Sequence, residues 1–274
     1  MWKFIGFLCV FISFFQTYGN TEKSKISEIK KKGYLTVAML GEDCLPYVFK
    51  KKNGDIDGID VKLARLLAEA LDVSIKFDRT AKTFDDIVDV VSQGKADIGL
   101  SGLSITTKRA EKVSYSNPYV TLRKAFLLSR EAFLKKRKKP DDSLQDFFSN
   151  GNKIGVMKGN AYEFYARTMF PEAVLVFYDN KDIDTLAVTD LEKGKTDALF
   201  RDAFEVQKLI KTRYHGVLNY MAISLEDTFD PFGIIVPQNT PDLLNWINIF
   251  LQVQNISYTV DDLMKIFDQQ KNMR

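Results

Sequence analysis

The chain has 274 residues, enough for one large or two modest domains, and 45% of them are hydrophobic while 27% are charged. This composition is that of a folded globular protein and excludes an intrinsically disordered chain. The formal net charge is only +3, which argues against a nucleic acid as the partner.

The N-terminal residues, 1–19, form a segment of their own. One lysine precedes an apolar run, 4–15, and two small residues follow it, a pattern that predicts a cleaved secretory signal peptide. The run is short for a membrane span, and the alternative is an uncleaved anchor. Beyond this segment the chain contains one cysteine, Cys44, and one histidine, His215, so we expect no disulfide within the chain, no zinc site and no cofactor.

The first half of the chain alternates strand and helix patterns. Asp60 is a candidate N-cap for the first long helix, and Gly94 ends the second. A βαβαβ order implies a parallel sheet with helices on its faces. The predicted elements are a strand at 34–40, a helix at 59–71, a strand at 73–78, a helix at 84–94 and a strand at 96–102.

The second half repeats this alternation. The segments "SQGKADIGLSG" and "EKGKTDALFRD" each end a helix at glycine and enter a buried strand, which indicates two lobes of similar architecture. The C-terminal part is expected to pack on the first lobe, with chain crossings near 120–123 and 219–223. The predicted strands are 123–129, 153–159, 173–179 and 196–202, with helices at 161–170, 184–194 and 257–270, and a strand, a Pro-bounded turn and an amphipathic helix within 232–253.

The segment 101–109, "SGLSITTKR", follows a buried strand and carries several small hydroxyl residues and Arg109. Ligands of open parallel sheets bind beyond the carboxyl ends of the strands. Hydroxyl groups, a helix N-terminus near Thr107 and an arginine fork together would bind a carboxylate. The alternative is that the hydroxyls only cap the helix and Arg109 is solvated.

Asp202 follows the apolar "ALF" of the last strand in the second lobe, so we expect it at the edge of that sheet. An acid there would accept an ammonium group, and the alternative is a cap for the helix that follows. A carboxylate site on one lobe facing an ammonium site on the other would recognise an α-amino acid.

Several blocks of the chain resemble one known family. The blocks are "IKKKGYLTVAM", "NGDIDGIDVKLARLLAEAL", "FDDIVDVVSQGKADIGLSGLSITTKRAEKVSYSNPY", "KIGVMKGNAYE", "KGKTDALFRDAF" and "FGIIVPQNTPDLLNWIN". In this order, over residues 26–270, they are similar to the bacterial extracellular solute-binding proteins of the polar amino acid class, which serve ABC importers. The resemblance implies a type II periplasmic-binding-protein fold with two α/β lobes and a two-segment hinge. It places residues 20–121 and 222–274 in lobe 1 and residues 122–221 in lobe 2.

The resemblance also implies binding roles in the first lobe. Ser101, Gly102 and Ser104 should donate to the ligand α-carboxylate, and Arg109 should clamp it with two hydrogen bonds. Phe84, at the start of its helix, should form an apolar wall.

In the second lobe, the resemblance implies that Asp202 holds the α-ammonium group. Asn160 and Ala161 match a turn at which the family often has a hydroxyl residue. In the first lobe, Cys44 stands where the family usually has an aromatic residue, so stacking on that side is not expected.

The residues that contact the ligand side chain are less well defined by the resemblance. Glu42 and Asp43 lie where the family often places side-chain contacts, and two acids indicate a cationic side chain such as that of arginine or lysine. The alternative is that both are exposed turn residues. Tyr162 and Glu205 are further candidates.

The leading prediction is therefore an exported, monomeric carrier, not an enzyme. It would capture a free polar amino acid in an interlobe cleft in the periplasm and deliver it to a membrane ABC permease. The alternative on the same fold is a cyclohexadienyl dehydratase-like enzyme with Glu205 or Glu42 as general acid. A receptor sensor module is disfavoured because the sequence ends at Arg274, after a helix.

Overall fold

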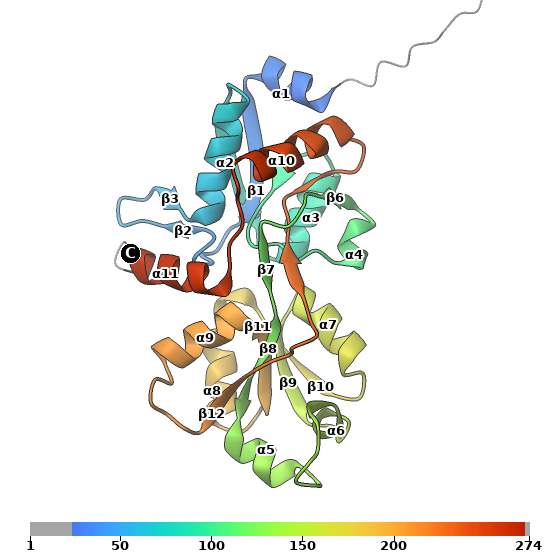
Figure 1. Cartoon of the computed structure of the whole chain (residues 1–274), viewed down its shortest axis with the longest axis vertical. Helices are drawn as coiled ribbons and strands as arrows, with labels where there is room; N and C mark the ends of the chain where they lie inside the picture. Colours follow the sequence, from blue (N-terminus) through green and yellow to red (C-terminus); the bar gives the residue numbers. More distant parts are fainter. Residues whose placement is uncertain (1–23, 272–274) are drawn as a thin grey trace, which may run out of the picture.

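The computed structural model describes residues 24–271, so the predicted signal peptide lies outside the described residues. Two five-stranded sheets with helices on their faces lie one above the other along the long axis (Figure 1). The two-lobe α/β fold implied by the resemblance is therefore confirmed.

The first lobe is built mainly from the N-terminal half of the chain. Its elements are α1 (Lys25–Lys32), β1 (Tyr34–Leu40), β2 (Phe49–Lys50), β3 (Ile56–Asp57), α2 (Ile59–Ala70), β4 (Ser74–Ala81), α3 (Phe84–Ser92), β5 (Ile98–Gly99), α4 (Thr107–Ala110), β6 (Val113–Tyr115), β14 (Ile235–Pro237) and α10 (Pro241–Val253). The sheet order is β4-β1-β5-β14-β6. Strand β1 is parallel to β4 and β5, whereas β14 is antiparallel to β5 and β6.

Alternating side chains of β1 face opposite sides of this sheet, as the period of two in a strand requires. Val37 and Met39 pack in the cluster that contains helix α2, while Ala38 and Leu40 pack with helix α3. Strand β1 is thus buried on both faces, which explains its continuous apolar sequence.

The second lobe has the same plan. Its elements are β8 (Lys124–Ser129), α5 (Arg130–Lys136), α6 (Leu144–Phe148), β9 (Lys153–Met157), α7 (Ala161–Met169), β10 (Val174–Tyr178), the 3₁₀ helix η1 (Asn180–Asp182), α8 (Leu186–Glu192), β11 (Ala198–Asp202), α9 (Ala203–Thr212) and β12 (Tyr220–Ser224). The sheet order is β10-β9-β11-β8-β12. Strands β9, β10 and β11 are parallel, and β8 is antiparallel to β11 and β12.

Two chain segments connect the lobes. They pair as antiparallel strands, β7 (Val120–Leu122) and β13 (Asp230–Phe232). All five residues of β12 pair with β8, so residues 222–224, which the sequence assigned to lobe 1, lie in the sheet of the second lobe. The return crossing therefore lies after β12 and includes β13.

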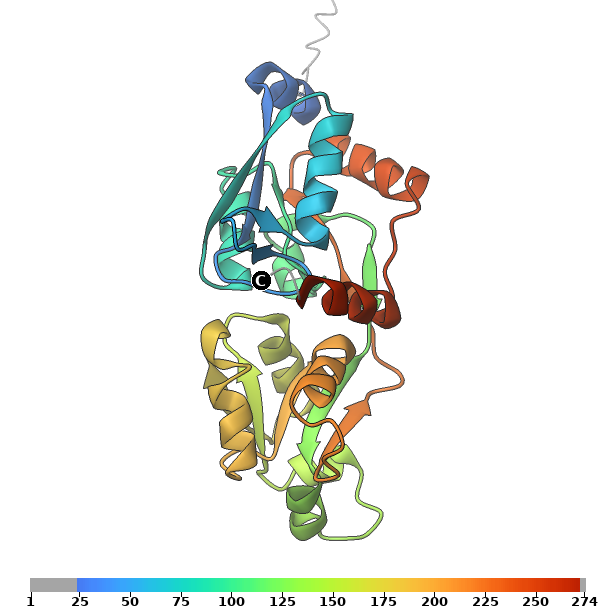
Figure 2. The same cartoon turned by 90° about the vertical axis from the view of Figure 1, so that its left-hand side faces the viewer.

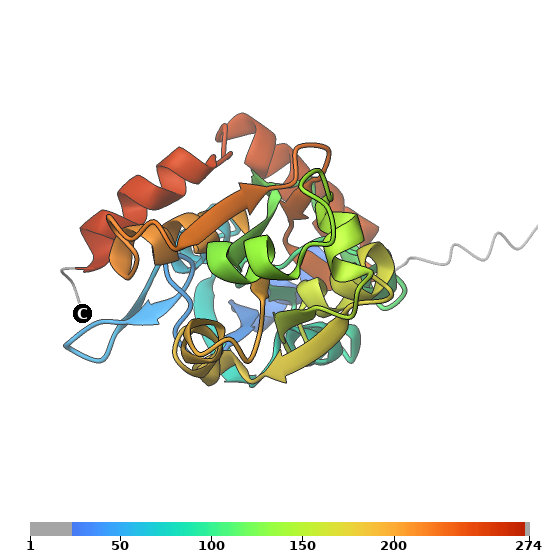
Figure 3. The ribbon, with the colours of Figure 1, turned by 90° about the horizontal axis from the view of Figure 1, so that it is seen from below.

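Both C-terminal helices pack in the core cluster of the first lobe, and one of them also contacts the second lobe. Helix α10 packs on the core of the first lobe, as expected for the end of the chain. Helix α11 (Val260–Lys271) lies at the level between the lobes in two perpendicular views (Figures 1 and 2). Its Phe267 packs edge to face on Phe204 of α9, and Gln270 donates to the carbonyl of Pro46 in the first lobe. Both helices follow one side of the molecule (Figure 3).

Asp60 has a different place from the predicted one. Gly58, not Asp60, is the N-cap of helix α2, and Asp60 lies fully buried in its first turn. Its carboxylate accepts hydrogen bonds from the backbone N–H of Gly102, at 2.7 Å, and from the hydroxyl of Tyr119, at 2.9 Å. Asp60 therefore anchors the loop that follows β5.

Candidate functional site

A cavity between the lobes brings together most of the residues singled out in the sequence. The first lobe contributes the loops after β1 and β5, the start of α3 and Arg109 of α4, and the second contributes the ends of β9 and β11 and the starts of α7 and α9. Eight of the nine predicted residues line this cavity: Ser101, Gly102, Ser104, Arg109, Phe84, Asn160, Ala161 and Asp202.

Arg109 is buried in the wall of this cavity, with only 5% of its surface exposed. Its Nε donates to Oδ1 of Asp85 at 2.9 Å, and its Nη1 donates to the carbonyl of Ser104 at 3.2 Å. The buried Nη2 has no partner among the described residues. A buried charged donor without an acceptor costs free energy, so a ligand anion at this point would satisfy it.

The loop between β5 and Arg109 uses many of its polar groups internally. The hydroxyl of Ser101 accepts the N–H of Leu40, at 2.9 Å. The N–H of Gly102 is engaged by Asp60, which differs from the expected role as a donor to a ligand. Thr106 caps α4, as predicted, but α4 has only four residues. An anion in this cavity would therefore be bound by the Arg109 guanidinium rather than by the dipole of helix α4.

Asp202 lies at the opposite wall and has both of the roles considered for it. Its Oδ1 accepts the N–H of Glu205, at 2.8 Å, so Asp202 is the N-cap of α9. It also lines the cavity and is 6% exposed. Burial, followed by the nearby Glu205 carboxylate, raises the pKa of Asp202 to about 7. A ligand ammonium group would offset both effects.

The remaining predicted site residues lie at the N-termini of two helices, α3 and α7. Phe84 is 8% exposed and is the first residue of α3, after the N-cap Thr83. Asn160 caps α7 by accepting the N–H of Tyr162, and Ala161 begins the helix. The two helix starts approach each other, since the N–H of Asp85 donates to the carbonyl of Gly159 at 3.3 Å.

Glu42 lies in a different place from the other predicted site residues. Glu42 is exposed and does not line this cavity. Its Oε2 accepts the side-chain N–H of Asn180 in η1, at 2.5 Å, so it joins the two lobes at the rim. Asp43 accepts from Arg79 and from the N–H of Lys50. Both acids line a neighbouring pocket, which shares Cys44, Met157, Arg201 and Glu205 with the cavity.

Cys44, which had no predicted binding role, lies where the two pockets meet. Its N–H and carbonyl both pair with Val48, at 2.7 and 2.9 Å, so the backbone around it is fixed. Burial, followed by the Glu205 carboxylate, raises the pKa of its thiol, which keeps the side chain protonated and unreactive.

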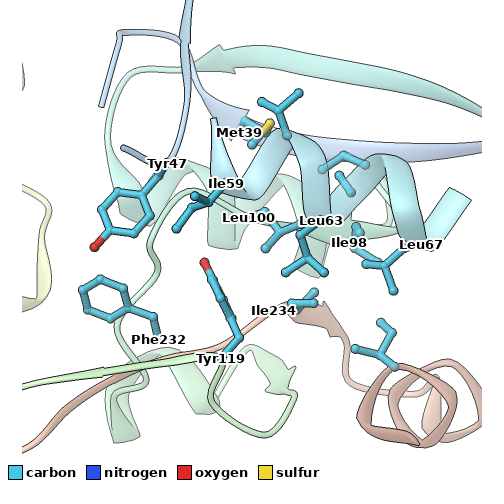
Figure 4. Packing of buried hydrophobic residues seen from close by; sticks show 14 of the residues in the cluster. Met39, Tyr47, Ile59, Leu63, Leu67, Ile98, Leu100, Tyr119, Phe232 and Ile234 are labelled. Atoms are coloured by element: carbon cyan, nitrogen blue, oxygen red, sulfur yellow. The ribbon is translucent and has the colours of Figure 1, made fainter. Parts of the chain in front are cut away.

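Tyr47 is a cavity residue that the sequence analysis missed. Its ring packs edge to face on Phe232, with 5.7 Å between ring centroids (Figure 4). Its buried hydroxyl has no partner among residues 24–271, and burial raises its pKa, so it remains a donor. The signal in the sequence was the Pro46–Tyr47 pair after the first strand, at a strand end of the kind that carries ligands.

Arg201 was also missed, although an arginine inside the apolar strand "ALFRD" requires a buried counterion. Its Nη2 donates to Oε2 of Glu205 at 2.6 Å, and its Nη1 donates to Oδ1 of Asp184 at 3.1 Å. Lys208 contacts the same two acids, at 2.6 Å to Glu205 and 3.1 Å to Asp184. We call these four side chains the charge quartet.

The described residues, 24–271, contain no group of three or more His, Cys, Asp or Glu side chains that could hold a metal ion. Within the same range, none of the helices combines the length and the apolar character that crossing a membrane requires.

Comparisons with known proteins agree with this architecture. The chain is 27% identical over 202 residues to ABC transporter arginine-binding protein 1 of Escherichia coli (strain K12), covering 72% of this chain and 75% of that protein. It is 28% identical over 214 residues to the cyclohexadienyl dehydratase of Pseudomonas aeruginosa, covering 77% of this chain and 73% of that enzyme.

A solved structure extends the similarity to nearly the whole fold. An ancestral amino acid-binding protein, described as a precursor of cyclohexadienyl dehydratase, is 29% identical with a TM-score of 0.70. The match covers 89% of this chain and 99% of that chain. The family model of the bacterial extracellular solute-binding proteins, family 3, matches residues 35–267. The chain therefore belongs to the bacterial extracellular solute-binding proteins, family 3.

Proposed function

We propose that this protein is an exported carrier that binds a free polar α-amino acid between its lobes and delivers it to a membrane ABC permease. The observation that carries the proposal is the pair of charges on opposite walls of the cavity. Arg109 in the first lobe has a buried donor without an acceptor in the part of the chain that the structure describes, and Asp202 in the second is a buried acid. An α-carboxylate and an α-ammonium group would satisfy the two.

Hinge closure supplies the mechanism. The ligand docks on the first lobe, and closure brings Asp202 to its ammonium group, a motion known for two-lobed binding proteins. Contacts across the cleft would hold the closed form, and they include Asn180 with Glu42 and the Tyr165 hydroxyl with the carbonyl of Ile105, at 3.3 Å. Because closure removes the ligand from water, both of its charges must be paired.

The location and partners follow from the same proposal. Residues 1–19 would direct the chain out of the cytoplasm, and a periplasmic monomer would present its ligand to the permease. The relative in Escherichia coli is named as a binding protein of an ABC transporter, which supports this partner. Residues 20–121 with 222–274 would form one lobe and 122–221 the other, apart from strand β12.

The alternative function is that of a dehydratase, as in the relative from Pseudomonas aeruginosa. A general acid in the cleft must be protonated when it acts. Glu205 forms ion pairs with Arg201 and Lys208, both at 2.6 Å, an arrangement that stabilises its carboxylate. Glu42 is exposed and lies outside the cavity. These features favour the carrier.

A thermal-shift screen of the purified protein against the twenty L-amino acids tests the proposal. A ligand present at about 100 times its Kd should stabilise the fold by roughly 2.7 kcal/mol, which raises the melting temperature measurably. Formation of phenylpyruvate from prephenate, with no shift by any amino acid, would instead support the dehydratase.

A further inference from the structure

The charge quartet forms a closed ring where the cavity meets the neighbouring pocket: Arg201 and Glu205 line both, whereas Lys208 and Asp184, whose side chain is 44% exposed, line the pocket alone. Each acid contacts both cations, and each cation contacts both acids, over distances of 2.6–3.1 Å. Side chains of Arg201 and Glu205 are only 7% exposed. The ring is therefore neutral and internally paired before any ligand arrives.

The ion pairs of the ring shift the pKa values of Asp184 and Lys208. Burial opposes ionisation of Asp184, but Lys208 and Arg201 outweigh this effect and lower the pKa of Asp184. Burial likewise opposes the charge on Lys208, but Glu205 and Asp184 raise its pKa. Asp184 and Lys208 are thus held in their charged forms, and each carboxylate of the ring is already paired with two cations.

The charged residues of the cavity itself also balance. Arg109 and Asp202 match the two charges of an amino acid backbone, and Arg201 and Glu205 match each other. A zwitterion with a neutral side chain leaves every charge paired. An arginine or lysine side chain would bring one more positive charge beside Arg201, and like charges in a buried site are costly.

The ring nevertheless offers hydrogen bonds to a neutral group. Both ion pairs of Glu205 use Oε2, so Oε1 is the oxygen of this carboxylate that takes part in neither of them. The guanidinium of Arg201 has five N–H donors and makes hydrogen bonds to only two acceptors. A donor and an acceptor therefore lie side by side in the wall.

We infer that the side-chain end of this site selects a neutral group that both donates and accepts hydrogen bonds, a carboxamide such as that of L-glutamine, over the cationic side chains of arginine and lysine. The inference rests on the proposed function of the cavity. It replaces the cationic ligand that Glu42 and Asp43 indicated in the sequence, because those acids lie outside the cavity, in the neighbouring pocket, where Asp43 pairs with Arg79 and Glu42 accepts from Asn180.

Isothermal titration of the intact protein with L-glutamine, L-arginine and L-lysine tests this selectivity. We expect L-glutamine to bind at least tenfold more tightly than either basic amino acid. Equal affinities, or tighter binding of L-arginine or L-lysine, would overturn the inference.

Substitutions within the ring test its cause. Arg201→Met leaves two acids with one cation, so the ratio of L-arginine to L-glutamine affinity should rise at least tenfold. Lys208→Met makes the same change in charge at a less buried position and serves if Arg201→Met does not fold. Lys211→Met is the matched control, since Lys211 is on the same helix but pairs with Asp268 at the surface. An unchanged ratio in both ring variants would overturn the inference.

The outcomes also separate this inference from the function on which it rests. If no amino acid binds the unsubstituted protein, the proposed function fails and with it the selectivity. If amino acids bind but the basic ones are preferred and the ring variants leave that preference unchanged, the carrier function stands and the role of the charge quartet is wrong.

Discussion

At the scale of single residues, the Arg109 guanidinium donates to two acceptors, Asp85 and the carbonyl of Ser104, while its buried Nη2 has no acceptor within residues 24–271. Substituting Arg109→Ala should weaken amino acid binding by about 2–5 kcal/mol, the range for removing one partner of a buried charge pair. Isothermal titration measures the change. Lys112→Ala removes an exposed positive charge nearby and should leave affinity unaltered; equal loss in both variants would contradict the clamp.

Asp202 makes binding depend on pH in a defined direction. With its pKa at about 7, the carboxyl is largely protonated in the free protein at pH 6, whereas the ammonium group of the ligand requires the anion. Glu205 and Asp230 oppose its charge and Arg201 favours it. Affinity should therefore rise as pH increases toward about 7 and level off above it.

Titration calorimetry in two buffers of different ionisation enthalpy measures the protons released on binding. We expect release at pH 6, little at pH 8.5, and a smaller release at pH 6 in Asp202→Asn. Proton uptake at pH 6, or identical release in the variant, would show that Asp202 does not hold the ammonium group.

At the scale of elements, the loop after β5 is shaped by Gly102. Its φ of +64° is in the left-handed region, and a Cβ there would lie 3.0 Å from the ring of Tyr47. Gly102→Ala should lower the free energy of unfolding by the roughly 1–2 kcal/mol that this conformation costs an L-residue, and by more because the ring must move.

Gly94 provides a matched comparison for this loop. Its φ is +69°, but a Cβ there would meet nothing within 4 Å, so Gly94→Ala pays only the conformational cost. Urea unfolding should rank Gly102→Ala as the less stable of the two variants. Equal stability would mean that Tyr47 does not pack tightly against the loop.

Local patterns in the sequence predicted most elements because the apolar spacing of a strand or helix is a local property. Strand β1 was predicted with its observed bounds, and Thr106 caps α4 as expected. Asp60 was assigned to the wrong role because its partner, Gly102, lies 42 residues away. Glu42 was also misplaced because its partner is distant in the sequence. Only the packed lobes show that Glu42 accepts a hydrogen bond from Asn180 at the rim instead of lining the cavity.

At the scale of the whole molecule, Asp230 in the crossing strand β13 connects the two lobes. It is fully buried and accepts a hydrogen bond from the hydroxyl of Tyr162 on α7. Ser104 of the first lobe also contacts this carboxylate, and both Ser104 and Tyr162 line the cavity. The Asp230 carboxylate thus joins two cavity-lining side chains, Ser104 and Tyr162, to the crossing strand β13.

Tyr162→Phe should therefore weaken ligand binding about tenfold, because it leaves the buried Asp230 short of a donor in the closed form. Tyr178→Phe is the control, since Tyr178 donates to Asp190 within the second lobe, at 3.1 Å. The control should lose stability but keep its ligand affinity. If both variants bind as tightly as the unsubstituted protein, Asp230 has no part in closure.

Equilibrium dialysis against an equimolar mixture of the twenty L-amino acids, read by mass spectrometry, tests the central claim most directly. The claim is that Arg109 and Asp202 hold an amino acid between the lobes. The unsubstituted protein should retain one or a few amino acids, and Asp202→Asn and Arg109→Ala should retain far less of them. No retained amino acid, or equal retention by the variants, would contradict it.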